Sequence, residues 1–163
     1  REIFQTMRAW VFELGYEPLL KSHREKLKET VIWNIELGRK LSLKDHADAS
    51  RKQAQMFMRL ENFMEDFEYL VSPVTQVLPF DHSTEFITEI DGVELETYID
   101  WMRSCTDIST TMHPAISVPA AFSDSNLPVG VQIVGRNRAD LSVLQLAFSF
   151  EQATRVGEQA PLF

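Results

Sequence analysis

Two short apolar runs near the end of the chain constrain its fold more than any other feature. The first, residues 115–118, lies between Pro114 and Pro119, and the second, residues 129–134, ends at Gly135. Short apolar runs with such boundaries are typical of buried strands. Because prolines and glycines mark where strands of this kind begin and end, we predict that both runs belong to one sheet.

A helix is predicted directly after the second run, over residues 141–154. Asp140 is a candidate N-cap, and Gly157 lies just beyond the expected C-terminus. Apolar residues occur on more than one side of this segment. We therefore predict a deeply buried helix that covers the sheet instead of lying on a surface.

The N-terminal part of the chain is predicted to be mainly helical. Apolar residues recur every three or four positions over residues 2–14 and 22–37, and Gly15 and Gly38 are the expected helix ends. A third helix is predicted over residues 42–67. Its C-terminal half carries a regular stripe of Met and Phe, which we interpret as a core face.

The middle of the chain predicts a strand, a hairpin and a further helix. Residues 69–73 are typical of a short strand that stops at a proline. Residues 86–97 hold two alternating runs joined by Asp91-Gly92, a dipeptide that suits a two-residue hairpin turn. Residues 98–111 predict a helix followed by an irregular stretch.

This order of elements predicts an α/β fold with a partial mixed β-sheet and flanking helices. Few strands are available, so the sheet is incomplete unless other chain segments supply its neighbours. We treat residues 1–163 as one segment of a domain. Within it we expect a mainly helical layer in residues 1–67 and the strands, hairpin and terminal helix in residues 68–163.

The charge of the chain argues against two classes of partner. The formal net charge is −8 and the isoelectric point is about 5.0, which disfavours nucleic acid and anionic membrane surfaces. Residues 1–60 carry 12 Lys and Arg against 8 Asp and Glu, whereas residues 61–163 carry 4 against 16. This unevenness fits two solvated faces of different sign, or one half that meets a complementary surface.

Several features bear on the location and completeness of the chain. No apolar run approaches the roughly 20 residues that span a bilayer, and the first residues do not resemble a signal peptide. The single cysteine, Cys105, fits a reducing compartment. We therefore expect a cytoplasmic protein. The chain does not begin with Met, as expected of a cut or partial chain.

Self-sufficient active-site patterns are absent from the sequence. There is no glycine-rich phosphate loop, no G-x-S-x-G elbow, no S-x-x-K and no C-x-x-C. The four histidines share no ligand spacing, so we predict neither a metal site nor a cofactor. Three weaker candidates have commoner non-catalytic interpretations as surface or core residues: Asp81 with His82, Cys105 with His113, and Glu94 with Glu96.

One block carries a family resemblance. Residues 113–135, HPAISVPAAFSDSNLPVGVQIVG, resemble the amidase signature family pattern, in which two strands bounded by Pro and Gly meet through a turn. Residues 67–75 and 150–154 give supporting similarity to a strand and to the last helix of that family. The resemblance extends over about residues 42–155 and implies the C-terminal part of the amidase signature fold.

The resemblance implies hydrolysis of amide bonds, specifically C–N bonds other than peptide bonds. The family uses a serine nucleophile, a bridging serine with a cis peptide bond, and a lysine, all carried by the N-terminal half of its fold. Nothing in this sequence matches that half, so we assign no catalytic residue and expect the chain to be inactive alone. The implied partners are the missing N-terminal half and a small-molecule amide substrate, and a homo-oligomer is also considered.

The chain departs from the family at positions that lie near the substrate pocket. Several members have Thr where Cys105 stands and Asn where Ser109 stands, and Gly is common where Met112 stands. These three residues are therefore our substrate-pocket candidates. Their departures weigh against the glutamine amidase component of the transamidosome. The family also usually has Gly at Ala121 and Asn126, where Asn tolerates a turn better than most residues.

Two other functions remain open at this stage. The chain is alternatively a non-catalytic acidic interaction module that reuses this half of the fold. A thiol hydrolase that uses Cys105 is a more remote alternative.

Overall fold

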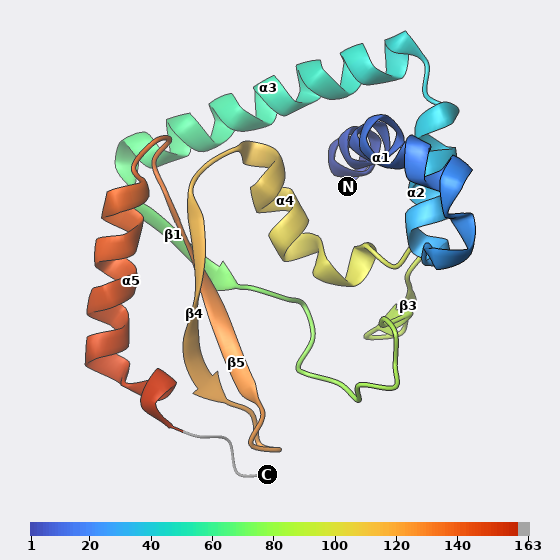
Figure 1. The fold of residues 1–163 in the computed structure, drawn as a ribbon. Helices are drawn as coiled ribbons and strands as arrows, with labels where there is room; N and C mark the ends of the chain where they lie inside the picture. The colour runs from blue at the N-terminus through green and yellow to red at the C-terminus, as the bar shows by residue number, and fades with distance from the viewer. Residues whose placement is uncertain (160–163) are drawn as a thin grey trace. The chain divides into compact units, whose positions relative to one another are not determined.

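The computed structural model of the chain describes residues 1–159 (Figure 1). These residues form two compact units, which divide between Met56 and Phe57 within one long helix. In chain order the helices and strands are α1 (Glu2–Ser22), η1 (Arg24–Lys26), α2 (Glu29–Arg39), α3 (Leu43–Asp66), β1 (Tyr69–Pro73), β2 (Glu89–Ile90), β3 (Val93–Glu94), η2 (Asp100–Met102), α4 (Arg103–Thr111), β4 (Ala115–Phe122), β5 (Pro128–Gly135), α5 (Asp140–Thr154) and η3 (Val156–Glu158).

Helix α1 continues past the glycine that was expected to end it. It extends through Gly15 and Pro18 to Ser22, so the predicted end is wrong. Gly and Pro both weaken a helix interior, but tertiary packing overrides such preferences. Here Ala9 before Gly15 and Leu20 after it are both buried, so packing stabilises the helix on both sides of the weak point.

Gly38 lies inside α2 and serves close helix packing. The prediction that it ends the helix is wrong, because α2 continues to Arg39. A Cβ atom at Gly38 would lie 2.3 Å from the Ala9 carbonyl oxygen and 2.7 Å from the Glu13 Cβ. Only a glycine therefore lets α1 and α2 approach this closely. Beside this contact lies a small core of Leu20, Ile32 and Ile35.

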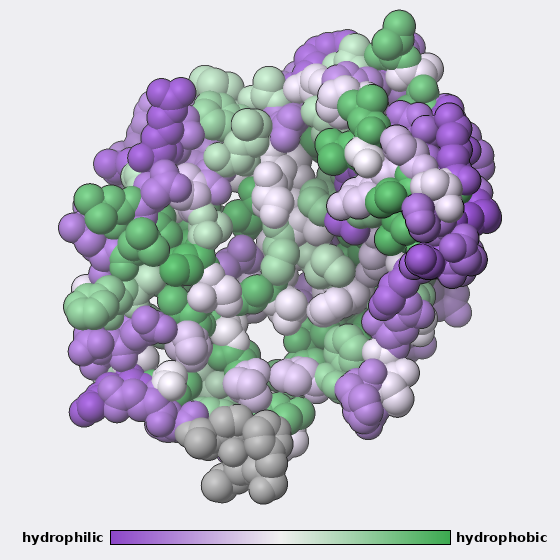
Figure 2. All heavy atoms as spheres, in the orientation of Figure 1, coloured by the Kyte–Doolittle hydropathy of each residue, from purple (hydrophilic) through white to green (hydrophobic). Residues whose placement is uncertain are grey.

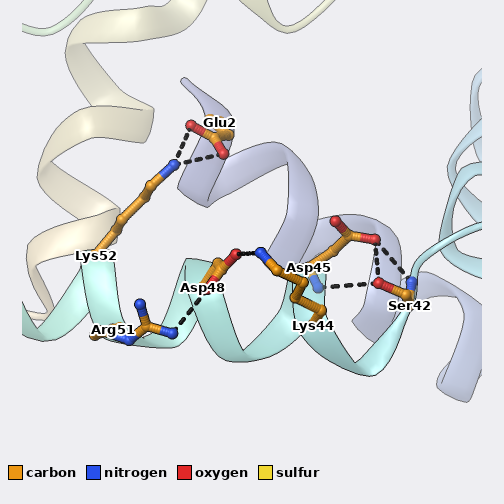
Figure 3. A network of polar contacts seen from close by, with 7 residues as sticks. All are labelled: Glu2, Ser42, Lys44, Asp45, Asp48, Arg51 and Lys52. Atoms are coloured by element: carbon orange, nitrogen blue, oxygen red, sulfur yellow. Dashed lines mark hydrogen bonds and ion pairs between the residues drawn. The ribbon is translucent and has the colours of Figure 1, made fainter.

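Helix α3 begins with a reciprocal cap, which Figure 3 shows. The Ser42 backbone N–H donates to Asp45 Oδ2 at 2.9 Å, and the Asp45 N–H donates to Ser42 Oγ at 3.2 Å. This pairing satisfies donors that a helix N-terminus leaves open. It confirms the predicted start near Ser42. Exposed ion pairs follow, such as Arg51 with Asp48 and Lys52 with Glu2, and pairs of this kind contribute little to stability.

The main sheet has the strand order β1-β5-β4, with β5 at its centre. Both pairings are antiparallel, with Tyr69 opposite Gly135 and Ile116 opposite Ile133. The two predicted strands therefore share one sheet, and the α/β class is confirmed. A parallel neighbour, which a mixed sheet requires, is not found among the strands of residues 1–159.

Strand β4 continues through the proline that was expected to stop it. It reaches Phe122, with an irregularity in the register between Pro119 and Ala121. Within the described residues β4 is an edge strand, and an edge strand tolerates Pro because its outward side needs no N–H donor. In the turn that follows, Asn126 has a φ of 60°, a left-handed conformation that Asn adopts more readily than most residues.

Helix α5 covers one face of this sheet with one of its own faces. Val143 and Ala147 pack against Val118 and Ile133 in a buried cluster. The end of β5 is shaped for this contact, because a Cβ atom at Gly135 would lie 2.4 Å from a methyl carbon of Val143. The second strand run, the glycine that ends it and the helix thus form one local packing unit.

The other face of α5 is exposed, so the prediction of burial on several sides is wrong for the described residues. Leu141, Leu144 and Phe148 are 69%, 54% and 64% exposed. Figure 2 shows apolar spheres gathered at the left of the view, where Figure 1 places α5. The helix begins at Asp140 itself, and Arg155 takes the left-handed position after its end. Sequence alone cannot say what covers a second apolar face.

The predicted hairpin is confirmed but short. Strands β2 and β3 have two residues each, with Glu89 opposite Glu94. The turn residues Asp91 and Gly92 have φ values of 51° and 75°, as a hairpin turn with two left-handed positions requires. Among the described helices, none combines the length and apolar character needed to cross a bilayer.

Candidate functional site

The three substrate-pocket candidates lie on helix α4 and at its C-terminal cap. Cys105 and Ser109 are one helical turn apart, and Met112 follows the last helical residue. Cys105 is half-buried, whereas Ser109 is exposed and the Met112 side chain is 66% exposed. The structure thus brings the three residues onto one short element. In Figure 1 α4 and α5 lie on opposite sides of β4 and β5.

Met112 ends α4 in a conformation that usually belongs to glycine. Its φ is 61° and its ψ is 16°, and its backbone N–H donates to the Ser109 carbonyl at 3.3 Å. A left-handed conformation costs a residue with a Cβ atom about 1–2 kcal/mol. The exposed Met side chain makes few contacts that would offset this strain.

The buried side of α4 is made of threonines. The hydroxyls of Thr106, Thr110 and Thr111 donate to the carbonyls of Arg103, Thr106 and Ile108. A hydroxyl has one hydrogen to donate, so these three donors are used within α4 itself. These three donated bonds stabilise α4 itself and do not join it to another element.

Hydrogen bonds with other segments converge on the first turn of α4. Ser104 Oγ and Cys105 Sγ both donate to the Val74 carbonyl, at 2.6 and 2.8 Å. The Arg103 backbone N–H donates to Gln76 Oε1 at 2.7 Å. These contacts join the start of α4 to the segment that leaves β1.

Gln132 completes this connection from the centre of the sheet. Its Nε2 donates to the carbonyls of Pro73 and Ser104, both at 3.1 Å. This residue was not predicted from the sequence, although a signal was present. Gln132 is the one polar side chain in the apolar run 129–134, and a buried amide must find partners.

The geometry does not support a thiol nucleophile. Burial raises the pKa of Cys105, which disfavours the thiolate that attacks a substrate. The His113 ring is buried, with Nδ1 2.9 Å from the Thr111 carbonyl oxygen and Nε2 2.9 Å from Glu61 Oε1. Both ring nitrogens are thus engaged, and the Cys105 thiol donates elsewhere.

The remaining charged candidates lie on the surface. The His82 side chain is 100% exposed, and its Nδ1 lies 3.7 Å from Asp81 Oδ1. That carboxylate accepts hydrogen bonds from the Ser83 hydroxyl and backbone N–H, which lower the pKa of Asp81 and shape the loop. Glu94 is exposed on the hairpin. These positions fit solvated polar surface.

Two depressions in the structure are lined by other residues. One, of about 590 Å³, lies in the second unit beside Glu61, Glu65 and Arg136. The other, of about 570 Å³, lies in the first unit beside Trp10, Glu13 and His46. In residues 1–159, no group of three or more His, Cys, Asp or Glu side chains could hold a metal ion.

Comparison with known proteins identifies the family. The family model described as Amidase matches residues 12–144. A glutamyl-tRNA(Gln) amidotransferase subunit from Alkaliphilus metalliredigens (strain QYMF) is 30% identical over 159 residues, which cover 94% of this chain and 31% of that protein. Acylamidase from Rhodococcus erythropolis is 34% identical over 116 residues, which cover 71% of this chain and 24% of that protein. The two identities are close, so overall similarity does not separate an acylamidase from the amidotransferase component.

Solved structures share the fold. A bacterial aryl acylamidase of the amidase signature family matches with a TM-score of 0.82 and 23% identity, over 96% of this chain and 34% of that one. A 6-aminohexanoate cyclic dimer hydrolase matches with a TM-score of 0.75 and 19% identity, over 99% of this chain and 36% of that one. The chain spans about a third of the length of the relatives that it matches over most of its own length. With its strands, its terminal helix and its family match all in agreement, the chain belongs to the amidase signature family.

Proposed function

We propose that this chain supplies the C-terminal sheet and part of the substrate pocket of an enzyme that hydrolyses amide bonds with a serine nucleophile. The observation that carries the proposal is the Amidase family match over residues 12–144. The block at residues 113–135, which forms β4, β5 and their turn, supports it because its Pro and Gly positions follow the family pattern.

The chemistry itself is assigned to a part of the fold that this sequence does not match. The family carries its serines and lysine on a glycine- and serine-rich stretch, and no such stretch occurs here. The best nucleophile in the chain, Cys105, has a raised pKa and donates its proton to the Val74 carbonyl. We therefore expect residues 1–163 to have no amidase activity alone.

The contribution of this chain to the pocket is assigned to α4. Ser109 and Met112 present exposed side chains, and Cys105 lies half-buried in the first turn of the helix. None of the three is given a covalent role. Their expected part is to select the acyl group, because specificity depends on how well a pocket fits the transition state.

A panel of aryl amides and esters tests the proposal. We expect the intact protein to turn over at least one amide and the chain of residues 1–163 to turn over none. Cys105→Ser in the intact protein should keep most of the activity. Turnover by the chain alone that disappears in Cys105→Ala would contradict the proposal and restore the thiol mechanism.

A second candidate is a non-catalytic acidic interaction module. One observation favours it, namely the 16 Asp and Glu in residues 61–163. The two candidates predict different sequences upstream of Arg1 in the full reading frame. A glycine- and serine-rich segment preceded by a lysine and followed by a serine belongs to the amidase, and its absence favours the module.

A further inference from the structure

Gln132 occupies a site where an apolar residue would be the simpler choice. It lies on the central strand β5 and is only 5% exposed. Its neighbours Val131 and Ile133 pack in the cluster under α5, so the Gln132 side chain points to the opposite face of the sheet. A buried amide is unfavourable unless its hydrogens find acceptors, which makes the two acceptors of Gln132 informative.

Those acceptors come from segments far apart in sequence. Pro73 is the last residue of β1 and lies 59 positions from Gln132, and Ser104 is in the first turn of α4 and lies 28 positions away. One NH₂ group therefore joins the centre of the sheet, the end of β1 and the start of α4. We call Gln132, Ser104, Cys105 and Gln76, with the carbonyls of Pro73 and Val74, the α4 clamp.

The α4 clamp matters because it ties the first turn of α4 to the sheet. The three buried threonines donate their hydroxyl hydrogens within the helix, and Met112 at the far end is exposed and strained. From β5, Gln132 donates one hydrogen bond to Ser104 in the first turn of α4 and a second to Pro73 at the end of β1, so it ties this end of α4 to two strands of the sheet. A shift at this end would carry Ser109 and Met112 with it, because a helix moves as a rigid element.

We propose that Gln132 is a positioning residue that fixes α4 as a wall of the substrate pocket. This inference rests on the proposed function, which places α4 beside the substrate. Gln132 donates to one backbone carbonyl at the end of β1 and to one in the first turn of α4. It acts on the substrate indirectly, by fixing the positions of Ser109 and Met112. Loss of its two hydrogen bonds should weaken substrate binding more than it slows the chemical step.

Alkylation of Cys105 reports the position of α4 directly. The Cys105 thiol belongs to the α4 clamp, and loosening the clamp exposes it. In the intact protein, iodoacetamide modification followed by mass spectrometry of the Cys105 peptide gives its rate separately from any other cysteine. Gln132→Met keeps the length of the side chain but removes its donors. We expect it to raise the alkylation rate of Cys105 about tenfold, which corresponds to the loss of roughly one net hydrogen bond. The matched control is Gln145→Met at an exposed position on α5, which should leave the rate unchanged.

Steady-state kinetics then separate positioning from a purely structural role. With an aryl amide substrate, Gln132→Met should raise KM several-fold and change kcat by less than about twofold, because the lost contacts are remote from the reacting bond. If Gln132→Met does not fold, Ser104→Ala removes one bond of the same clamp and should move both measurements in the same direction by less.

The outcomes are distinct. An unchanged Cys105 rate in folded Gln132→Met overturns the clamp, and a faster rate with unchanged KM overturns its role in substrate positioning. A wild-type intact protein that hydrolyses no amide contradicts the proposed function instead, and the alkylation rates still decide whether Gln132 holds α4.

Discussion

At the scale of single residues, Met112 combines strain with exposure. Its φ of 61° is one of five left-handed non-glycine positions described in the structure, and it lies where the family usually has Gly. Backbone strain at one residue persists only where the surrounding structure imposes it. Here the cap of α4 and the entry to β4 impose it on a side chain that has little packing of its own.

Met112→Gly should therefore stabilise the chain by about 0.5–1 kcal/mol. Glycine relieves the left-handed strain, and the greater freedom of glycine in the unfolded chain offsets part of the gain. Met112→Ala is the control, because it removes the side chain and keeps the strain. Urea unfolding monitored by circular dichroism measures both, and equal midpoints for Met112→Gly and Met112→Ala would show that the conformation is not strained.

The same substitution should change substrate selection in the intact enzyme. If Met112 narrows the pocket, Met112→Gly shifts the ratio of kcat/KM for a bulky and a small acyl group about tenfold toward the bulky one. Met112→Leu keeps the bulk and should keep the ratio. A ratio that is the same in all three proteins removes Met112 from the pocket.

At the scale of elements, two glycines in helices have opposite roles. A Cβ atom at Gly38 would collide with the Ala9 carbonyl at 2.3 Å, whereas a Cβ atom at Gly15 meets nothing within 4 Å. The first glycine allows two helices to approach, and the second only weakens the helix that contains it. Glycine-to-alanine substitution at these two positions therefore compares an open environment with a tightly packed one within the first unit.

Gly15→Ala should stabilise the first unit by about 0.8–1 kcal/mol, the difference in helix propensity. Gly38→Ala should destabilise it by about 1–3 kcal/mol, because the added methyl group meets backbone that cannot move aside cheaply. Denaturant unfolding followed by tryptophan fluorescence measures both, in a Trp101→Phe background that leaves Trp10 and Trp33 of the first unit as the fluorophores. Two changes of the same sign would contradict the packing role of Gly38.

This contrast also explains which elements the sequence could predict. The strand runs, the Asp91-Gly92 turn and the start of α3 depend on neighbouring residues, so local patterns located them. The roles of Gly15 and Gly38 depend on whether another helix approaches, which local patterns do not contain. The two acceptors of Gln132 are likewise 28 and 59 positions away, so its partners could not be predicted even though its need for them could.

At the scale of the whole molecule, the described residues leave an apolar helix face and two sheet edges without a covering element. Leu141, Leu144 and Phe148 line the outer face of α5, and both edges of the described sheet lack a further strand. Soluble monomers rarely leave large apolar patches uncovered. The sequence grouped Cys105, Ser109 and Met112 correctly, because they share one helix and its cap. It did not predict the two depressions, which other residues line.

We therefore expect the chain of residues 1–163 to bind a hydrophobic dye or to self-associate. The double variant Leu144→Gln and Phe148→Gln should reduce dye fluorescence and light scattering, because it removes two large apolar side chains from the outer face of α5. Ser149→Gln, exposed on the same helix, is the control. A wild-type monomer that binds no dye would mean that this face needs no cover, and it would favour the interaction module.

The central position of β5 also implies an order of folding. Its contacts with β4 and α5 join residues that are near in sequence, so these three elements can associate after closing only short loops. Its pairing with β1 requires the closure of a much longer loop, because 59 positions separate Pro73 from Gln132. The β4–β5–α5 unit should thus form first during refolding. β1 should dock last, and the α4 clamp, which needs β1 in place, would then be the final part of the second unit to form.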